Sequence, residues 1–158
     1  MADKFIKDNL AMKKTLIMGI GNLLLGDEGV GVHAAKQLKE RELPEWVEVV
    51  DAGTAFLDVL PYFENSERII VMDAMMANGD PGTVYRVPLE ECTRKERLDS
   101  MHGFDIFRML DMAGNKRKTE VVVFGVEPSE IKWSLKLSEQ VSRSIPCLLE
   151  IIFREITI

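Results

Sequence analysis

Two acidic residues in a glycine-rich loop are the first side chains of this sequence whose type and spacing suggest chemistry. The stretch GIGNLLLGDEGVG, residues 19–31, follows an apolar run and contains Asp27 and Glu28 side by side. Because a helix N-terminus favours negative charge and offers free N–H groups, Asp27 is expected to cap the helix that follows. Glu28 is then left to point out of the loop, where it can act as a ligand or an acid–base group.

The same loop is a poor candidate for a nucleotide site. A dinucleotide fingerprint, GxGxxG, requires a third glycine, and that position holds Leu24. The phosphate loop requires a lysine after its last glycine, where Asp27 and Val32 stand instead. Two carboxylates would also repel a phosphate. We therefore predict that Leu24 packs inward against the first helix and closes the volume that a pyrophosphate would need.

Three further residues could complete a site with Glu28. Asp73 ends the apolar run RIIVMDA, and Asp51 ends the run WVEVVDAG. His102 stands in a loop beside a glycine, just before a helical pattern. If the strands are parallel, their carboxyl ends meet at the edge of the sheet where ligands bind. Glu28, Asp73 and His102 would then supply two oxygens and one nitrogen, a set that suits a divalent transition metal with open coordination positions.

Each candidate also has a purely structural interpretation. Glu28 could serve only the helix dipole, Asp73 could cap the segment after it, and His102 could bind backbone. Asp51 could be a general base, or it could simply stabilise the turn DAGTA. The other histidine, His33, falls on the polar face of the first helix and is expected to be solvated.

A cysteine peptidase is a further alternative. Cys92 precedes His102 by ten residues, but it lies in the highly charged stretch LEECTRKER and no orienting partner for the pair is evident. The sequence therefore gives the hypothesis of a cysteine peptidase little support.

The pattern of elements indicates an α/β fold. Short β-branched runs alternate with segments of helical period, and the runs that are apolar throughout are typical of strands buried on both faces. The run TVYRV alternates instead, as an edge strand does. The strands are predicted at 15–20, 46–53, 68–74, 83–87 and 119–126, and the helices at 29–42, 55–65, 103–113 and 138–155.

Composition limits the classes of function. A chain of 158 residues, 46% hydrophobic, is expected to form one domain over residues 14–158 after a flexible leader at 1–13. The net charge of -6 argues against a nucleic-acid partner. No apolar run approaches the roughly 20 residues that span a bilayer, so no membrane partner is expected. Two cysteines without a CxxC motif predict reduced thiols and a cytoplasmic protein.

Four stretches, in order, resemble the hydrogenase maturation endopeptidases. They are GIGNLLLGDEGVG, VVDAGTA, IIVMDA and SMHGFDIFRML, and the similarity runs from Lys14 to Pro128. Members of that family remove the C-terminal extension from the large-subunit precursor of nickel-iron hydrogenases. The resemblance implies a three-layer α/β/α sandwich with a mixed, mostly parallel sheet of five strands. It also implies that Glu28, Asp73 and His102 are the metal-binding residues.

The resemblance further implies that the metal is nickel and that the precursor supplies it, although another divalent metal could replace it in vitro. The ion could polarise the scissile carbonyl or activate a bound water. Alternatively it could only position the tail, with Asp51 as general base and the carboxylates of Glu28 and Asp73 also candidates for catalysis. A monomer that acts on the hydrogenase precursor is expected. A non-catalytic metal-binding maturation chaperone and a nucleotide-binding module remain as alternatives.

Overall fold

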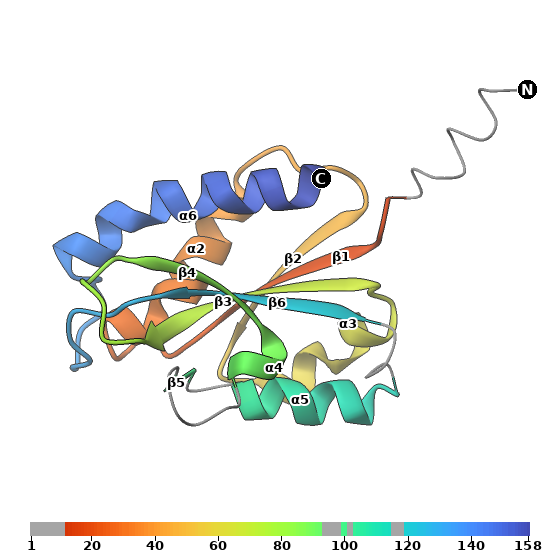
Figure 1. Ribbon diagram of the computed structural model, residues 1–158, viewed down its shortest axis with the longest axis horizontal. Helices are drawn as coiled ribbons and strands as arrows, with labels where there is room; N and C mark the ends of the chain where they lie inside the picture. The colour runs from red at the N-terminus through yellow and green to blue at the C-terminus, as the bar shows by residue number, and fades with distance from the viewer. Residues whose placement is uncertain (1–11, 93–98, 101–102, 115–118) are drawn as a thin grey trace, which may run out of the picture.

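The centre of the molecule is a twisted sheet in the strand order β2-β1-β3-β6-β4 (Figure 1). The structure is a computed structural model that describes residues 12–92, 99–100, 103–114 and 119–158. A two-residue strand, β5, pairs with the end of β3 beside this sheet. The strands are β1 (Thr15–Ile20), β2 (Val47–Gly53), β3 (Arg68–Met76), β4 (Val84–Pro88), β5 (Asp99–Ser100) and β6 (Glu120–Val126).

The burial of the strands agrees with their sequence patterns. All six residues of β1 are buried, as is the stretch of β3 from Ile69 to Met75, because helices cover both faces of these strands. The strands β2, β1, β3 and β6 are parallel, whereas β4 runs antiparallel to β6 at the edge of the sheet. The expected mixed, mostly parallel sheet of five strands is therefore confirmed, and so is the prediction of an edge strand at 83–87.

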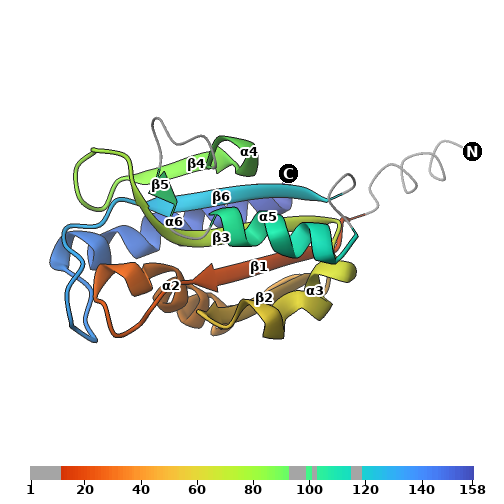
Figure 2. The ribbon, with the colours of Figure 1, turned by 90° about the horizontal axis from the view of Figure 1, so that it is seen from below.

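Helices form a layer on each face of the sheet (Figure 1), and Figure 2 looks onto the face that α3 and α5 cover. One apolar core joins one face of the sheet to α2 and α6. The second core joins the other face to η2, α3, α4 and α5. The three-layer arrangement is thus confirmed. The helices are η1 (Asp27–Gly29), α2 (Val30–Lys39), η2 (Phe56–Val59), α3 (Leu60–Glu64), α4 (Leu89–Cys92), α5 (Gly103–Met112) and α6 (Glu139–Thr157).

Most helices lie where the sequence predicts them, with local differences. The first begins with the 3-10 turn η1 before the α-helical geometry of α2 starts at Val30. Pro61 occupies the first turn of α3, a position where its missing N–H is not needed. Pro146 stands inside α6 without ending it. The short elements α4 and β5 were not predicted. No helix in the described part of the chain is both long and apolar enough to cross a membrane.

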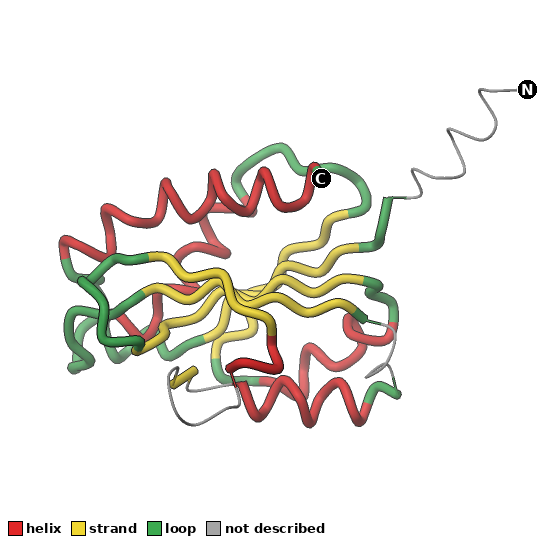
Figure 3. The backbone as a smooth tube through the Cα atoms, in the orientation of Figure 1, coloured by secondary structure: helices red, strands yellow, loops and turns green. Residues whose placement is uncertain are grey.

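The carboxyl ends of the parallel strands bring several loops to one edge of the molecule, on the left in Figure 3. The loops after β1, β3 and β6 gather there. At this edge the first turn of α2 rests directly on the sheet, since a Cβ atom on Gly31 would lie only 2.0 Å from the carbonyl oxygen of Met72 and 2.5 Å from that of Ile20. The absence of a side chain at Gly31 therefore sets how closely the glycine-rich loop approaches β3.

Candidate functional site

Glu28 lies in η1, at the carboxyl edge of the sheet, and only 4% of its surface is exposed. The turn packs against β3, which carries Asp73. Gly21, with φ of +135°, allows the loop to fold back so tightly that a Cβ atom there would lie 2.0 Å from the carbonyl oxygen of Glu28. The glycine spacing of the loop thus serves close packing around an acid, and phosphate binding is not needed to explain it.

Asp73 lies near the carboxyl end of β3 and is 1% exposed. It pairs in register with Gly125 of β6, and its Oδ1 accepts a hydrogen bond from the N–H of Ala74 at 2.8 Å. By strand alternation its side chain shares the face of Val71 and Met75, the face that α5 covers. Two nearly buried carboxylates at one edge are costly unless polar partners or a cation compensate them, and their oxygens suit a divalent ion.

His102 falls outside the described residues, so its role as the third ligand stays a prediction. The described residues on either side of it are informative. Ser100 pairs with Met75 at the end of β3, and α5 begins at Gly103. Ser100 therefore lies beside the strand that carries Asp73, and α5 packs in the same apolar cluster as Met75. Over the described ranges no three His, Cys, Asp or Glu side chains form a metal-binding group, and the predicted set has only two members there.

Asp27 is not the helix N-cap that the sequence predicts. Gly26 precedes η1, and no side chain caps that turn. The carboxylate of Asp27 is 1% exposed and reaches the loop that follows β6. Its Oδ2 accepts hydrogen bonds from the N–H groups of Ser129 (2.9 Å) and Glu130 (3.4 Å), and its Oδ1 accepts one from Ser138 (2.7 Å). The acid next to Glu28 therefore holds both ends of a distant loop, residues 128–138.

Leu24 also differs from its prediction. It is 49% exposed and does not fill the space against the first helix, because its backbone carbonyl turns toward the 128–138 loop and accepts the N–H of Ser134 at 3.0 Å. This loop was not recognised from the sequence as a functional segment. Its one available signal is the placement of Trp133 and Leu135 among charged residues, in IKWSLKLS.

The remaining sequence candidates, His33, Asp51 and Cys92, lie in three different environments. His33 is half-buried, in contrast to the solvated position expected, and burial, aided by the charge of Lys36, lowers its pKa below the ordinary value. Asp51 is exposed, and its Oδ1 accepts the N–H of Gly53 at 3.1 Å, which is the turn-stabilising role considered as its alternative. Burial raises the pKa of the Cys92 thiol to about 12, and the negative charge of Asp73 adds to the shift. Cys92 is therefore a poor nucleophile.

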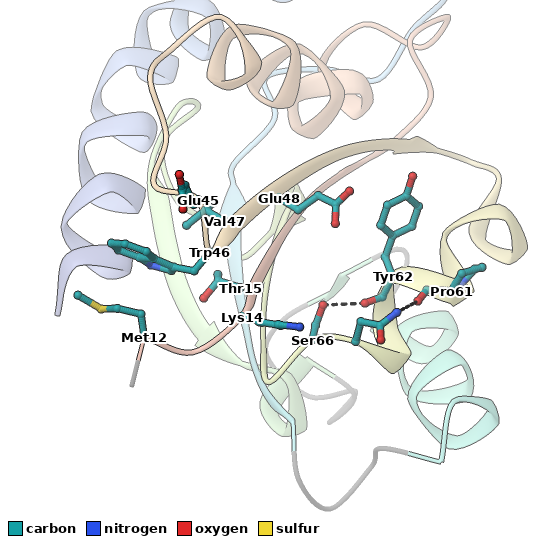
Figure 4. A pocket seen from close by; sticks show the side chains of 11 residues that line it. Met12, Lys14, Thr15, Glu45, Trp46, Val47, Glu48, Pro61, Tyr62 and Ser66 are labelled. Carbon is teal, nitrogen blue, oxygen red and sulfur yellow. Dashed lines mark hydrogen bonds between the residues drawn. The ribbon is translucent and has the colours of Figure 1, made fainter. Parts of the chain in front are cut away.

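A cavity of roughly 690 Å³ lies at the opposite edge (Figure 4). It is formed where β1 and β2 begin and where α3 ends, and its lining includes Trp46, Tyr62 and Met12. Its acids, Glu45 and Glu48, are exposed. This cavity is far along the strands from Glu28 and Asp73, so the candidate site does not coincide with it.

Comparison with known proteins gives a consistent result. Residues 32–155 match the family model described as hydrogenase maturation protease. A protein of Methanocaldococcus jannaschii, whose name places it among the hydrogenase maturation proteases, is 36% identical over 151 residues, which are 91% of this chain and 97% of that protein. The hydrogenase 2 maturation protease of Escherichia coli is 31% identical over 143 residues, 87% of each chain. The structure of the hydrogenase-maturating endopeptidase HybD of Escherichia coli superposes with a TM-score of 0.79 at 27% identity, covering 91% of this chain and 92% of that one.

Proposed function

This chain belongs to the hydrogenase maturation protease family, and on that premise we propose that Glu28, Asp73 and His102 recognise nickel carried by its substrate. The family makes the chain an endopeptidase that acts on the precursor of a hydrogenase large subunit. We propose in addition that it removes the C-terminal extension of a nickel-iron enzyme after nickel has been inserted. We also propose that it works as a monomer in the cytoplasm; its two free thiols support the cytoplasmic location.

One observation carries this proposal. The turn that holds Glu28 packs against the strand that holds Asp73, and both carboxylates are almost completely buried at the edge where the loops gather. An ion arriving with the precursor could be bound there by oxygen ligands that the fold already holds in place. A side chain buried by its surroundings has few alternative positions, so little ordering is needed when the substrate binds.

The donor set explains why the substrate would bring the ion. Glu28, Asp73 and His102 include no thiolate and leave coordination positions open, so they hold a divalent ion less tightly than a closed four-ligand site does. The ion is present only after nickel has been inserted into the precursor, and the same ion can then position the tail for cleavage. A bound divalent ion also polarises a carbonyl group or activates water, and Asp51 remains the candidate general base if the metal only positions the tail.

Paired cleavage reactions test the proposal. Pure enzyme is first analysed for metal, and nickel-loaded and nickel-free precursors are then incubated with it side by side, with the products measured by mass spectrometry. We expect an enzyme with little bound metal that cleaves only the nickel-loaded precursor. Equal cleavage of both precursors, by an enzyme with one tightly bound zinc per chain, would identify an ordinary metallopeptidase and refute the recognition of nickel.

A further inference from the structure

Four apolar side chains are exposed where the loop after β1 meets the loop after β6. Trp133 is 80% exposed and Leu135 is 68% exposed. Ile131, in the same loop, and Leu24, in the loop after β1, are exposed as well. Gly26 pairs with Ile131, and Leu24 is bonded to Ser134, so these residues occupy one region of the surface. We call Leu24, Ile131, Trp133 and Leu135 the loop patch.

The loop patch is held in place by backbone bonds. Gly26 donates to the carbonyl of Ser134 at 2.8 Å, in addition to the bond from Ser134 to Leu24. The hydroxyl of Ser134 accepts the N–H of Lys136 at 3.1 Å, and Asp27 holds the two ends of the loop. The loop is thus ordered while its tryptophan is exposed to solvent. An ordered loop loses little conformational entropy on binding, so Trp133 is well placed to contact a partner.

We infer that the loop patch is the docking surface for the body of the precursor protein, beside the tail that enters the site. This inference rests on the proposed function. The patch is continuous with the site, since Leu24 belongs to the loop of Glu28 and Asp27 immediately precedes Glu28 in the chain. Gly26, two residues before Glu28, donates its N–H to the carbonyl of Ser134, so the loop patch lies at the same edge of the molecule as the proposed entry of the tail. Exposed aromatic side chains are the usual anchors of protein interfaces.

The chemistry around the patch favours a protein partner over a membrane. Glu130 and Lys132 form an ion pair next to it, and Lys136 adds a further charge, so the apolar centre has a mixed polar rim of the kind found in protein interfaces. A membrane-binding surface would instead carry an excess of basic residues, whereas this chain has a net charge of -6. The surface expected on the precursor is an apolar pocket or groove that accepts an indole ring.

The two tryptophans of the chain provide a direct test, because they lie at opposite edges of the sheet. The enzyme is labelled with 5-fluorotryptophan, and its two fluorine resonances are assigned with Trp46→Phe. Nickel-loaded hydrogenase large-subunit precursor from the source organism is then added. The resonance of Trp133 should shift, and that of Trp46, which lines the distant cavity, should not.

Cleavage kinetics provide the second measurement. Trp133→Ala should raise KM for the precursor roughly 30-fold with little change in kcat, as truncation of a central interface aromatic does. Leu135→Ala should raise KM about 5-fold. The matched control is Met112→Ala, since Met112 is 62% exposed at the end of α5, away from this edge, and its KM should equal that of the wild type.

The outcomes separate the inference from the function on which it rests. An unmoved Trp133 resonance in a reaction that the wild-type enzyme catalyses, or a KM for Trp133→Ala within twofold of wild type, would overturn the docking surface alone. A change in the enzyme's own oligomeric state caused by Trp133→Ala would identify the patch as a contact between two copies, and would also overturn it. Equal cleavage of nickel-free precursor with a shifted Trp133 resonance would refute nickel recognition and leave the docking surface supported.

Discussion

The two edges of the sheet differ in what they bury. At the carboxyl edge the acids Asp27, Glu28 and Asp73 are almost completely covered by protein. Glu127, which directly follows β6, is also buried at this edge. At the amino edge the acids Glu45 and Glu48 are exposed around a cavity of roughly 690 Å³. Covering a carboxylate is unfavourable, so a protein that does so four times within one edge has a structural or chemical use for each. Buried charge, more than cavity volume, marks the functional edge here.

The difference follows from the direction of the strands. Four parallel strands send their following loops to the carboxyl edge, where ligands bind in open α/β sheets. There the glycines at 19, 21 and 31 let the backbone of the loop and helix approach the sheet at distances that no side chain would allow. At the amino edge the chain enters the strands through bonds such as Glu67 N–H to Lys14 carbonyl, and the mostly covered carboxylate there, Glu155, is paired with Arg68 at the start of β3.

The largest effect should come from removing charge at the functional edge. Glu28→Gln and Asp73→Asn should each reduce cleavage of the nickel-loaded precursor more than about 100-fold, since even outer-shell partners of a metal are worth roughly 10 to 100-fold. Both changes preserve shape, so the melting temperature should stay close to that of wild type. His102→Ala should have the same effect on cleavage if it is the third ligand.

The matched controls for these variants lie at the other edge. Glu45→Gln and Glu48→Gln remove the same charge from the exposed rim of the cavity, and cleavage rates should stay at the wild-type value. Loss of cleavage in either control, with normal cleavage by Glu28→Gln, would reverse the assignment of the two edges.

The next effect concerns the close approach of α2 to the sheet. Gly31→Ala should destabilise the fold by about 3 kcal/mol or more, because its Cβ atom would meet two backbone oxygens that cannot move aside. The comparison is Gly114→Ala, where φ is +69° and no described atom lies within 4 Å, so only the backbone strain of about 1–2 kcal/mol applies. Urea unfolding of both variants measures the difference. Equal losses would show that the packing of α2 is not tight.

A smaller effect is expected for the acid that holds the 128–138 loop. Asp27→Ala removes the acceptor of three backbone N–H groups and should cost about 2 kcal/mol in unfolding free energy. Asp51→Ala, which loses one exposed hydrogen bond to Gly53, should cost about 0.5 kcal/mol.

Cleavage by Asp51→Ala then tests whether Asp51 is the general base, since removal of such a group lowers rates about 100-fold or more.

The smallest effect should appear in the pH dependence of stability. Because burial lowers the pKa of His33 in the folded state, the unfolded chain binds the proton more readily. Stability should therefore fall as pH drops through the ordinary histidine value of 6.5 toward the lowered folded value. His33→Gln should flatten this slope in thermal melts between about pH 7 and 5, and cleavage should be unchanged. An unaltered slope would show that His33 does not contribute.

Local patterns were sufficient for most of the framework. The apolar run of β1 and the helical period of α6 each depend on neighbours in the chain, so the strands and long helices were predicted close to their observed bounds. The elements that were missed, α4 and β5, are too short to show a period. Their existence depends on contacts with β4, β6 and the end of β3, which no local pattern contains.

The predictions that proved wrong share one cause. Asp27 precedes a helix, and Leu24 stands in an apolar stretch, so local rules assigned one to a cap and the other to the core. In the structure both face the 128–138 loop, and the bonds from Asp27 to that loop span 102 to 111 residues of sequence. The half-buried position of His33 is likewise a result of packing that helical phase alone did not indicate.

The sequence by itself determined the alternation of strands and helices, the glycine-rich loop, the acids at the strand ends and the family to which they point. Each of these depends on residue type and on spacing within one segment. The tertiary structure decided which acid became an internal anchor, which remained beside β3, and which apolar side chains stayed in water. These outcomes depend on the order β1-β3-β6, because that order brings the loop after β6 across to the loop after β1 and turns two distant segments into one surface.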